Sequence, residues 1–279
     1  MIRLVGLALH PVKSTATRRV RHAEVEPWGL ADDRRWMVVG PDAECLTVRE
    51  DRTLLTVVAD TPATDPTLRH GLRLRAPGTE PVEVHTPDTD AVPVTVHGRG
   101  LTGRPASEHA NTWLRAALGR DDVTLVHVAE PRPLNPRLTL PGEATAFADG
   151  YPVTLASAAS LRRLDDWVTE TALERGEEPV APLAMERFRP NLVVDGDLEP
   201  FEEDHWRQVR VGPVSFRVVK PVDRCVMTTV DPTSRERGPE PIRTLALHRR
   251  WDGSTWFAVQ LVPESRGVVR VGDEVTPDR

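Results

Sequence analysis

"VPVTVHGRGLTGRPAS", residues 92–107, decides between two fold classes. Its glycines match the GxGxxG pattern with which a strand, a turn and a helix bind a dinucleotide. The segment before them contains Pro93 and alternates apolar and polar residues, whereas the first strand of a dinucleotide fold is nearly all apolar. Pro105 also separates Gly103 from the expected N-cap, Ser107, so this glycine cannot lie in a helix that packs on a sheet. The stretch therefore favours a strand in a mainly β protein.

The same alternation recurs along the chain, and prolines and glycines divide it into short pieces. Besides the segment above, strands are predicted for 4–9, 34–40, 45–50, 54–60, 71–77, 82–85, 123–128, 151–157, 191–196, 206–212, 214–220, 226–231, 244–250, 256–262 and 268–275. Helical spacing predicts two helices, one between the N-cap Ser107 and the terminal Gly119, the other over 158–170 with Ser157 as N-cap. The predicted fold class is α+β, mainly β.

The chain has 279 residues, 39% of them hydrophobic, which suffices for one large or two ordinary globular domains. Its 36 basic and 42 acidic residues are mixed, so no basic block points to nucleic acid or to an anionic membrane as a partner. The apolar stretch 4–9 is too short to span a bilayer and has no cleavage site, so we expect a cytoplasmic protein. Residues 129–150 are rich in proline and lack periodicity, which indicates a domain boundary after residue 128 or a long active-site loop.

Residue counts and spacing exclude several common sites. Two cysteines, Cys45 and Cys225, are too few for a disulfide framework, a tetrathiolate zinc site or a 2Fe–2S module. The acidic stretch 195–204 has Pro200 where an EF-hand calcium loop needs glycine and Trp206 where it needs glutamate, so we expect a solvated loop there. HExxH and GxSxG are absent, which leaves zinc hydrolysis and a serine nucleophile without support.

Basic and polar side chains stand at the ends of several predicted strands. Lys13 and Ser14 follow the first strand, and Arg34 opens another. Arg189 and Asn191 stand where a later strand begins. Each alone has an ordinary explanation, since basic residues at strand ends are mostly solvated and contribute little.

Taken in order, these segments resemble the MOSC family, named for the C-terminal domain of the molybdenum cofactor sulfurase, together with its N-terminal β-barrel partner. The amino half contains "HPVKS", "GLADDRRWMVV" and "CLTVRE"; the carboxyl half contains "SAASL", "RFRPNLVVDG", "EEDHW", "DRCVMTTVDP" and "VRVGDEV". The resemblance covers most of the chain and is closest to the amidoxime-reducing branch. It implies an N-terminal β-barrel-like domain over 1–128 and a MOSC β-barrel domain with peripheral helices over 129–279.

The resemblance also implies a pyranopterin molybdenum cofactor. In that branch the cysteine of the Arg-Cys pair is a molybdenum ligand, and Cys225 stands in its place. A soft thiolate suits this metal, and the neighbouring Arg224 would favour the thiolate over the thiol. Predicted strands on either side, 214–220 and 226–231, would present the sulfur at a fixed depth. The alternative is that Cys225 is a small buried apolar residue.

Polar side chains from both halves of the chain would bind the phosphate and the pterin of that cofactor. Arginine and lysine form the charge-assisted bonds, while serine and asparagine add neutral donors and acceptors. The residues expected in this role are Lys13, Ser14, Arg34, Ser157, Arg189, Asn191 and Arg224. For Ser157 two roles stay open, an ordinary N-cap without a ligand and part of an anion-binding helix end.

Three further residues stand outside the family pattern or are only loosely aligned with it. Asp223 occupies a place near the metal ligand where a small polar residue or a cysteine is common, and it would repel an anionic substrate or act as a proton donor. Gln260 stands about where some members have a tyrosine near the cofactor. Cys45 lacks such a context and is expected to be structural.

The implied function is the reduction of small N-hydroxylated compounds, with the N–O oxygen removed at molybdenum ligated by Cys225. Iron–sulfur-bearing relatives have an additional C-terminal domain, whereas this chain ends soon after "VGDEV". We therefore expect a separate electron-donor protein that carries flavin, heme or an iron–sulfur centre. Two alternatives stay open: a carrier of the cofactor, or of a sulfur species on Cys225, without N-oxide turnover, and a scaffold adapted to one metabolite of a biosynthetic cluster.

Overall fold

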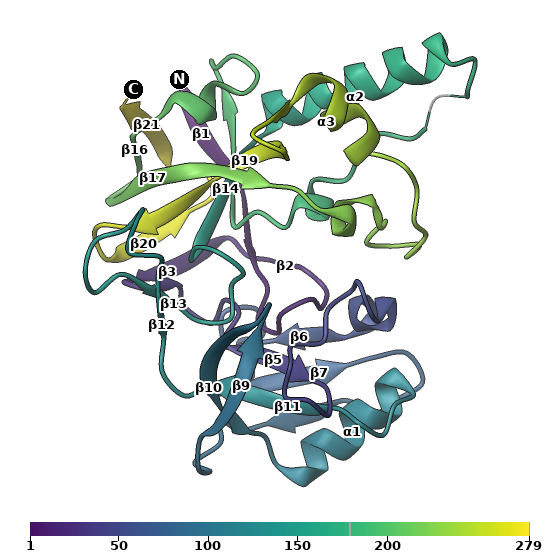
Figure 1. The fold of residues 1–279 in the computed structure, drawn as a ribbon. Coiled ribbons are helices and arrows are strands. Elements are labelled where there is room, and N and C mark those ends of the chain that lie inside the picture. The colour runs from purple at the N-terminus through teal and green to yellow at the C-terminus, as the bar shows by residue number, and fades with distance from the viewer. Residues whose placement is uncertain (179, 279) are drawn as a thin grey trace. The chain divides into compact units, whose positions relative to one another are not determined.

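The computed structural model describes residues 1–178 and 180–278, which form two compact units (Figure 1). Unit 1 comprises Met1–Leu7, Arg21–Pro27 and Val153–Arg279, and unit 2 comprises Ala8–Val20 and Trp28–Pro152. The two units are thus interleaved near the N-terminus of the sequence. Residues 129–150, which were expected to form a domain boundary or an active-site loop, belong to unit 2. A domain boundary after residue 128 stays a prediction.

Unit 1 is built on a closed barrel of seven strands (Figure 1). In order around the barrel these are β14 (Val153–Ser157), β15 (Leu192–Gly196), β1 (Ile2–Leu9), β21 (Glu274–Asp278), β16 (Gln208–Val211), β17 (Val214–Asp223) and β19 (Ser254–Pro263), which pairs again with β14. β14 and β15 run parallel, and the other neighbours in the ring are antiparallel. Outside the ring, β18 (Arg250–Trp251) pairs with β19, and β3 (His22–Glu26) pairs with β20 (Gly267–Arg270). Closure satisfies the backbone bonds that an open sheet would leave at its edges.

Helices cover part of this barrel. They are α2 (Ala158–Glu174), α3 (Ile242–His248) and the 3₁₀-helices η2 (Met185–Phe188), η3 (Glu202–His205) and η4 (Val226–Thr229). α2 buries Leu164 and Val168 at helical spacing, in one apolar cluster with Phe188 and Phe257. Within the described residues, no helix has the length and the apolar character that crossing a membrane requires.

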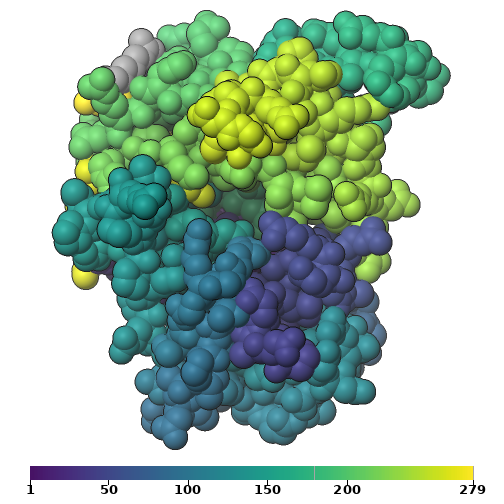
Figure 2. Space-filling model, in the orientation of Figure 1, coloured from purple at the N-terminus to yellow at the C-terminus, as the bar shows by residue number. Residues whose placement is uncertain are grey.

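Unit 2 contains two sheets. The larger has the order β5 (Trp36–Val39), β11 (Thr124–Val128), β10 (Arg99–Pro105), β9 (Val92–Val96), and the smaller joins β6 (Val58–Asp60), β7 (Leu72–Arg75) and β8 (Val82–Val84). Shorter elements are β2 (Arg18–Arg19), β4 (Gly29–Leu30), the 3₁₀-helix η1 (Arg52–Thr56), and the pair β12 (Arg132–Pro133) and β13 (Ala144–Thr145). α1 (Glu108–Leu118) packs on β11 and β8. The proline-rich segment around β12 is largely exposed and lies at the surface on the face drawn in Figure 2.

Several sequence predictions are confirmed. The described residues are mainly β with three α-helices, as the predicted fold class requires. α1 begins after Ser107, whose side chain accepts a hydrogen bond from the Ala110 N–H, and ends at Gly119 in the left-handed conformation. The GxGxxG segment forms β10, which pairs with β9 in a hairpin instead of opening a helix. A Cβ on Gly103 would lie 3.1 Å from the Val126 side chain, so this glycine permits the close approach of β11.

Five of the predicted strands are wrong in whole or in part. Residues 268–275 were predicted as one strand and are divided between β20 and β21 by a turn. Residues 45–50 make only a single bridge, from Cys45 to Val39, and 54–60 begin inside η1, whose N-cap Asp51 accepts a bond from the Thr53 N–H. Residues 226–231 begin with η4, and 244–250 are mostly α3. Short apolar runs fit either a strand or a buried helical turn, so the period alone does not separate the two.

Candidate functional site

Two turns bring Lys13, Ser14 and Arg34 together in unit 2. The Arg34 N–H donates to the carbonyl of His10 at 2.9 Å, and the Lys13 N–H donates to the carbonyl of Trp36 at 2.8 Å. The turn that follows β1 is therefore bonded along its backbone to the turn that precedes β5. Three residues that were expected to bind the cofactor share one corner of this unit.

Ser14, Arg34 and Arg189 share an uncommon backbone conformation. Their φ angles are 67°, 51° and 49°, in the left-handed region that favours glycine. Conformations of this kind cost roughly 1–3 kcal/mol each and persist where the surrounding structure holds them, often at binding sites. Seven other non-glycine residues of the described chain also have positive φ, so the conformation by itself assigns no function to these three.

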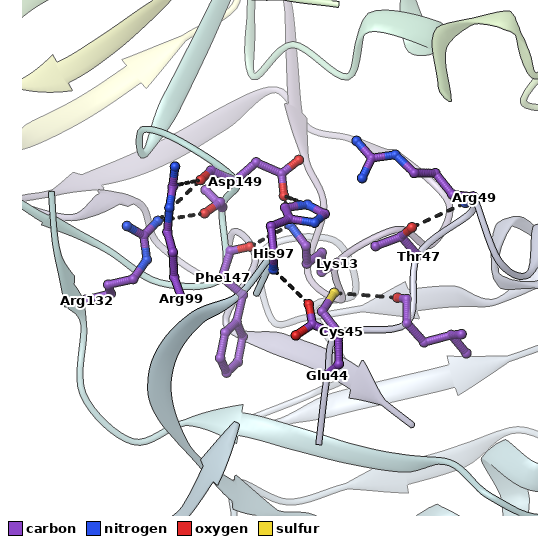
Figure 3. Close-up of polar contacts among 12 residues, drawn as sticks. Lys13, Glu44, Cys45, Thr47, Arg49, His97, Arg99, Arg132, Phe147 and Asp149 are labelled. Carbon is purple, nitrogen blue, oxygen red and sulfur yellow. Dashed lines mark hydrogen bonds and ion pairs between the residues drawn. The ribbon is translucent and has the colours of Figure 1, made fainter. Parts of the chain in front are cut away.

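The ammonium group of Lys13 is buried and already has two acceptors (Figure 3). The side chain is 6% exposed; its Nζ donates to the Phe147 carbonyl at 2.9 Å and forms an ion pair with Asp149. The Asp149 side chain is 64% exposed, and its carboxylate lies 3.0 Å from Nε2 of His97. The protein atoms around it partly desolvate the carboxylate, which would raise the pKa of Asp149, but Lys13 and His97 hold that pKa well below its ordinary value. An anion that binds Lys13 would thus compete with a charged carboxylate.

Two arginines hold the backbone on which Asp149 stands. Nη1 of Arg99 donates to the Asp149 carbonyl at 2.9 Å, and Nη2 of Arg132 donates to the Ala148 carbonyl at 3.0 Å (Figure 3). Desolvation lowers the pKa of Arg132, and the neighbouring Arg99 lowers it further. This part of unit 2 therefore collects positive charge around a single loop.

Cys45 belongs to the apolar core of unit 2, as the sequence analysis expected of a structural cysteine. Its Sγ lies 3.6 Å from the Leu46 carbonyl (Figure 3). Burial raises the pKa of its thiol to about 12, although Lys13 acts in the opposite direction. Because the thiolate is the reactive and metal-binding form, Cys45 is unsuited to either task at neutral pH.

Arg34 is oriented by a buried acid. Its guanidinium forms an ion pair with Asp33, which also accepts a bond from the His10 N–H at 2.7 Å. Burial would raise the pKa of Asp33, but Arg34 and the bonds from His10 bring it far below the ordinary value. The carboxylate therefore stays charged and holds one side of the Arg34 guanidinium.

In unit 1, Cys225 lies directly before η4, two residues after β17 ends at Asp223. Its side chain is half-buried and in no disulfide, and its neighbour Val226 is 45% exposed. This environment disagrees with the alternative of a thiol packed in an apolar core. The predicted second strand at 226–231 is replaced by η4, because the hydroxyls of Thr228 and Thr229 donate to the carbonyls three residues before them at 3.0 and 2.6 Å.

Asp223 ends β17 with an exposed side chain and pairs along the backbone with Trp256 of β19. An exposed carboxylate exchanges protons readily with water. Its expected role as proton donor stays a prediction.

Two arginines hold the turn that carries Cys225. Arg224 donates from Nε to the Phe257 carbonyl at 2.8 Å and from Nη1 to the Phe188 carbonyl at 2.9 Å. Arg187 donates to the Thr228 carbonyl at 3.4 Å and pairs with a carboxylate just beyond η4 at 2.8 Å. Since Phe188 precedes Arg189, these bonds join the Cys225 turn to the end of η2. Arg224, expected at the cofactor, therefore also has a structural task.

Asn191 and Ser157 are fully buried beside this region. The Asn191 N–H donates to the Thr154 carbonyl at 2.8 Å, and Asn191 Oδ1 accepts from the Thr154 N–H at 3.1 Å. Ser157 ends β14 and caps α2, since its Oγ accepts from the Ser160 N–H at 3.3 Å. The N-cap role of Ser157 is thus confirmed, and the structure leaves its second role, anion binding, as a prediction.

The residues of unit 1 fit a pyranopterin molybdenum group. A half-buried cysteine on a turn held by arginines is a suitable single protein ligand for a metal that would otherwise be bound by an organic dithiolene. Oε1 of Gln260, on the strand that pairs with β17, is buried and has no hydrogen-bond partner among the described residues. A buried amide oxygen without a donor costs free energy, and the N–H groups of a pterin edge would supply one.

Two family models match the chain: the MOSC N-terminal beta barrel domain over residues 1–121 and the MOSC domain over residues 143–276. The chain is also 32% identical to the mitochondrial amidoxime-reducing component 1 of Homo sapiens, across 96% of its own length and 81% of that protein. The chain belongs to the MOSC family.

Further relatives agree with this assignment. The MOSC protein is 31% identical to the mitochondrial amidoxime reducing component 2 of Rattus norvegicus, across 96% of its own length and 80% of that protein. It is 30% identical to the molybdenum cofactor sulfurase of Anopheles gambiae, across 93% of its own length and 34% of that protein. The resemblance that was drawn from the sequence is therefore confirmed.

Four residues of this MOSC protein were not singled out from the sequence as candidates for a role in the site. Asp149 and His97 have no motif around them, and only the fold places them at Lys13. Arg187 stands in "RFRP" and could have been chosen for its charge, but its bonds across the chain have no sequence signal. Glu203 lies in the acidic stretch that was expected to be a solvated loop, yet it is fully buried. The expectation holds for 196–200, which are mostly exposed, and is wrong for 201–204, because Phe201 and the following Trp206 carry this part of the segment into the core.

Proposed function

We propose that this protein binds the molybdenum cofactor and reduces small N-hydroxylated compounds, removing the oxygen of the N–O bond. The observation that carries the proposal is a half-exposed Cys225 at the place of the family's metal ligand, in a chain similar over 96% of its length to a protein named for amidoxime reduction. When bound, the cofactor would supply two-electron oxygen-atom transfer. The balance is one N–O bond broken, with two electrons and two protons taken up and one water released.

The residues of unit 1 would ligate and orient the cofactor. Cys225 provides the thiolate ligand, and Arg224 keeps its turn in place through two carbonyl groups. Ser157, Arg189 and Asn191 would supply donors and acceptors to the pterin and phosphate. Asp223, exposed beside the metal ligand, would deliver one of the two protons.

Lys13, Ser14 and Arg34 of unit 2 are proposed as further cofactor-binding residues. Lys13 and Arg34 each carry a positive charge beside an acid, Asp149 and Asp33 respectively. The ammonium of Lys13 has three N–H bonds and two acceptors among the described residues, so it would leave one donor for an anion. Their positive charge is what an oxygen-rich phosphate requires.

The reaction needs electrons from outside the chain. We propose a separate donor protein that carries flavin, heme or an iron–sulfur centre, and a cytoplasmic location for the reaction. Neither partner chemistry nor location alters the roles given above to Cys225 and Asp223.

The test is reduction of benzamidoxime with a chemical electron donor, together with the molybdenum content of protein from a host that makes the cofactor. Wild type is expected to carry molybdenum and to turn over, while Cys225→Ser loses turnover and most of the metal. Cys45→Ala is the matched control, because it removes the other thiol from the unit 2 core and should keep both properties. Wild-type protein without molybdenum would contradict the proposal.

The carrier alternative is separated by the same measurement. Its support is the similarity to a molybdenum cofactor sulfurase, of which this chain spans about a third. A carrier would hold molybdenum in wild type and would not reduce benzamidoxime or other N-hydroxylated compounds at any donor concentration.

A further inference from the structure

Glu203 is fully buried at the start of α2. Its two carboxylate oxygens lie 2.8 and 2.9 Å from Oγ of Ser160. Oγ of Ser160 in turn accepts from the Phe201 N–H at 2.7 Å, and the Ser160 N–H donates to Oγ of Ser157 at 3.3 Å. One acid of η3 thus holds Ser160 in the first turn of α2, and Ser160 is bonded to the N-cap Ser157.

The charges around Glu203 leave it without an ionic partner among the described residues. On its own element, Asp204 and His205 are adjacent, and Asp204 is paired with Arg249. The first turn of α2 contributes no acidic side chain, and its bonds to Glu203 come from the hydroxyl of Ser160. A buried carboxylate with only neutral partners is held in its charged form much less firmly than one in an ion pair.

We propose that Glu203 is a positioning residue of the cofactor site, which fixes Ser157 at the start of α2 and couples binding of the anionic cofactor to uptake of a proton. This inference rests on the proposed function, in which Ser157 contacts the cofactor. A negative charge bonded to Ser160, whose N–H donates to Oγ of Ser157, opposes a phosphate or other anion near Ser157, and protonation removes the opposition while the bonds to α2 remain.

The titration of Glu203 falls in a range where this coupling can be measured. Burial raises its pKa to about 7, and the nearby Asp204 adds to the increase, while the bonds from Ser160 and the backbone lower it. The carboxyl group is therefore mostly neutral at pH 6 and mostly charged at pH 8. The rate of cofactor release should therefore rise between pH 6 and pH 8, as the carboxyl group becomes charged.

The experiment measures how fast purified holoprotein loses molybdenum and pterin fluorescence at pH 6 and at pH 8. In wild type, release at pH 8 is expected to be roughly fivefold faster than at pH 6, which corresponds to about 1 kcal/mol. Glu203→Gln keeps the shape and one acceptor without the charge, so its release should be slow and equal at both values. Glu202→Gln is the matched control: it removes an acid one position away, whose carboxylate bonds the Glu199 N–H, and it should keep the wild-type ratio.

A second variant keeps the test decisive if Glu203→Gln does not fold. Ser160→Ala removes the hydroxyl bond that lowers the pKa of Glu203, so the pH at which release accelerates should move upward. The inference is overturned if Glu203→Gln releases cofactor faster at pH 8 than at pH 6 by the same factor as wild type. It is also overturned if Ser160→Ala leaves the pH at which release accelerates unchanged. Either result leaves the proposed function standing. Wild type without molybdenum overturns both.

Discussion

Replacing Glu203 with glutamine should change how the stability of the protein depends on pH. In the unfolded chain this carboxyl group titrates near its ordinary value of 4.5, whereas burial raises its pKa to about 7 in the folded protein. The folded state therefore binds the proton more tightly, and the group contributes stability that is fully present below pH 4.5 and lost as the pH rises through 7. Glutamine has no proton to lose, so the variant lacks this contribution.

The magnitude follows from the two pKa values. One pKa unit corresponds to about 1.4 kcal/mol, and between pH 5 and pH 8 the unfolded chain ionises almost fully while the folded chain does so only at the upper end. Across this interval wild type should lose about 2–3 kcal/mol of unfolding free energy more than Glu203→Gln does. Subtracting the variant from wild type cancels the other titrating groups.

The measurement is urea denaturation of wild type, Glu203→Gln and Glu202→Gln at pH 5, 6, 7 and 8, followed by tryptophan fluorescence. Glu202→Gln should run parallel to wild type. A wild-type minus Glu203→Gln difference that stays flat over this range, or that grows with pH, would refute the argument that burial governs this carboxyl group.

Three further outcomes are expected. Asp149→Asn should raise the fraction of chains that carry molybdenum in a cofactor-limited host, because Lys13 is released from its competing anion. A lower metal content would make Lys13 a structural residue. Arg187→Ala should lower the unfolding free energy by about 1–3 kcal/mol in thermal or urea denaturation, because it leaves a carbonyl and a carboxylate without their guanidinium donor. An unchanged unfolding free energy would contradict the role of Arg187 in holding the Cys225 turn. Iodoacetamide at pH 8 should alkylate cofactor-free protein once, at Cys225, because burial raises the pKa of Cys45 to about 12; mass spectrometry of the intact chain counts the adducts.

The sequence predicted those parts of the fold that depend on neighbouring residues. Ser107 and Gly119 bound α1, and Ser157 begins α2, because caps satisfy backbone groups within a few residues of themselves. Residues 226–231 were predicted wrongly for the converse reason. Whether a short threonine-rich segment extends or closes into a 3₁₀ turn depends on the backbone bonds around it, and alternation does not report them.

Some residues of the candidate site could likewise be predicted from the sequence, and others could not. Cys225 and the basic residues at strand ends could be named from their order along the chain, because an ordered series of motifs is specific even when each motif is common. Asp149 could not, since its contact with Lys13 joins residues 136 positions apart. Glu203 could not either, because an acidic stretch is ordinarily solvated and only packing shows that this one enters the core.

By itself, then, the order of residues determined the fold class, both ends of α1, the start of α2 and the identity of the sulfur expected to bind metal. Tertiary structure alone decided which charges face one another: Lys13 against Asp149 in unit 2, and Glu203 beneath the start of α2 in unit 1. The physical reason is the distance along the chain over which each interaction acts. Caps and alternation act between residues a few positions apart, whereas the charge state of a buried group depends on every chain segment that displaces water from it.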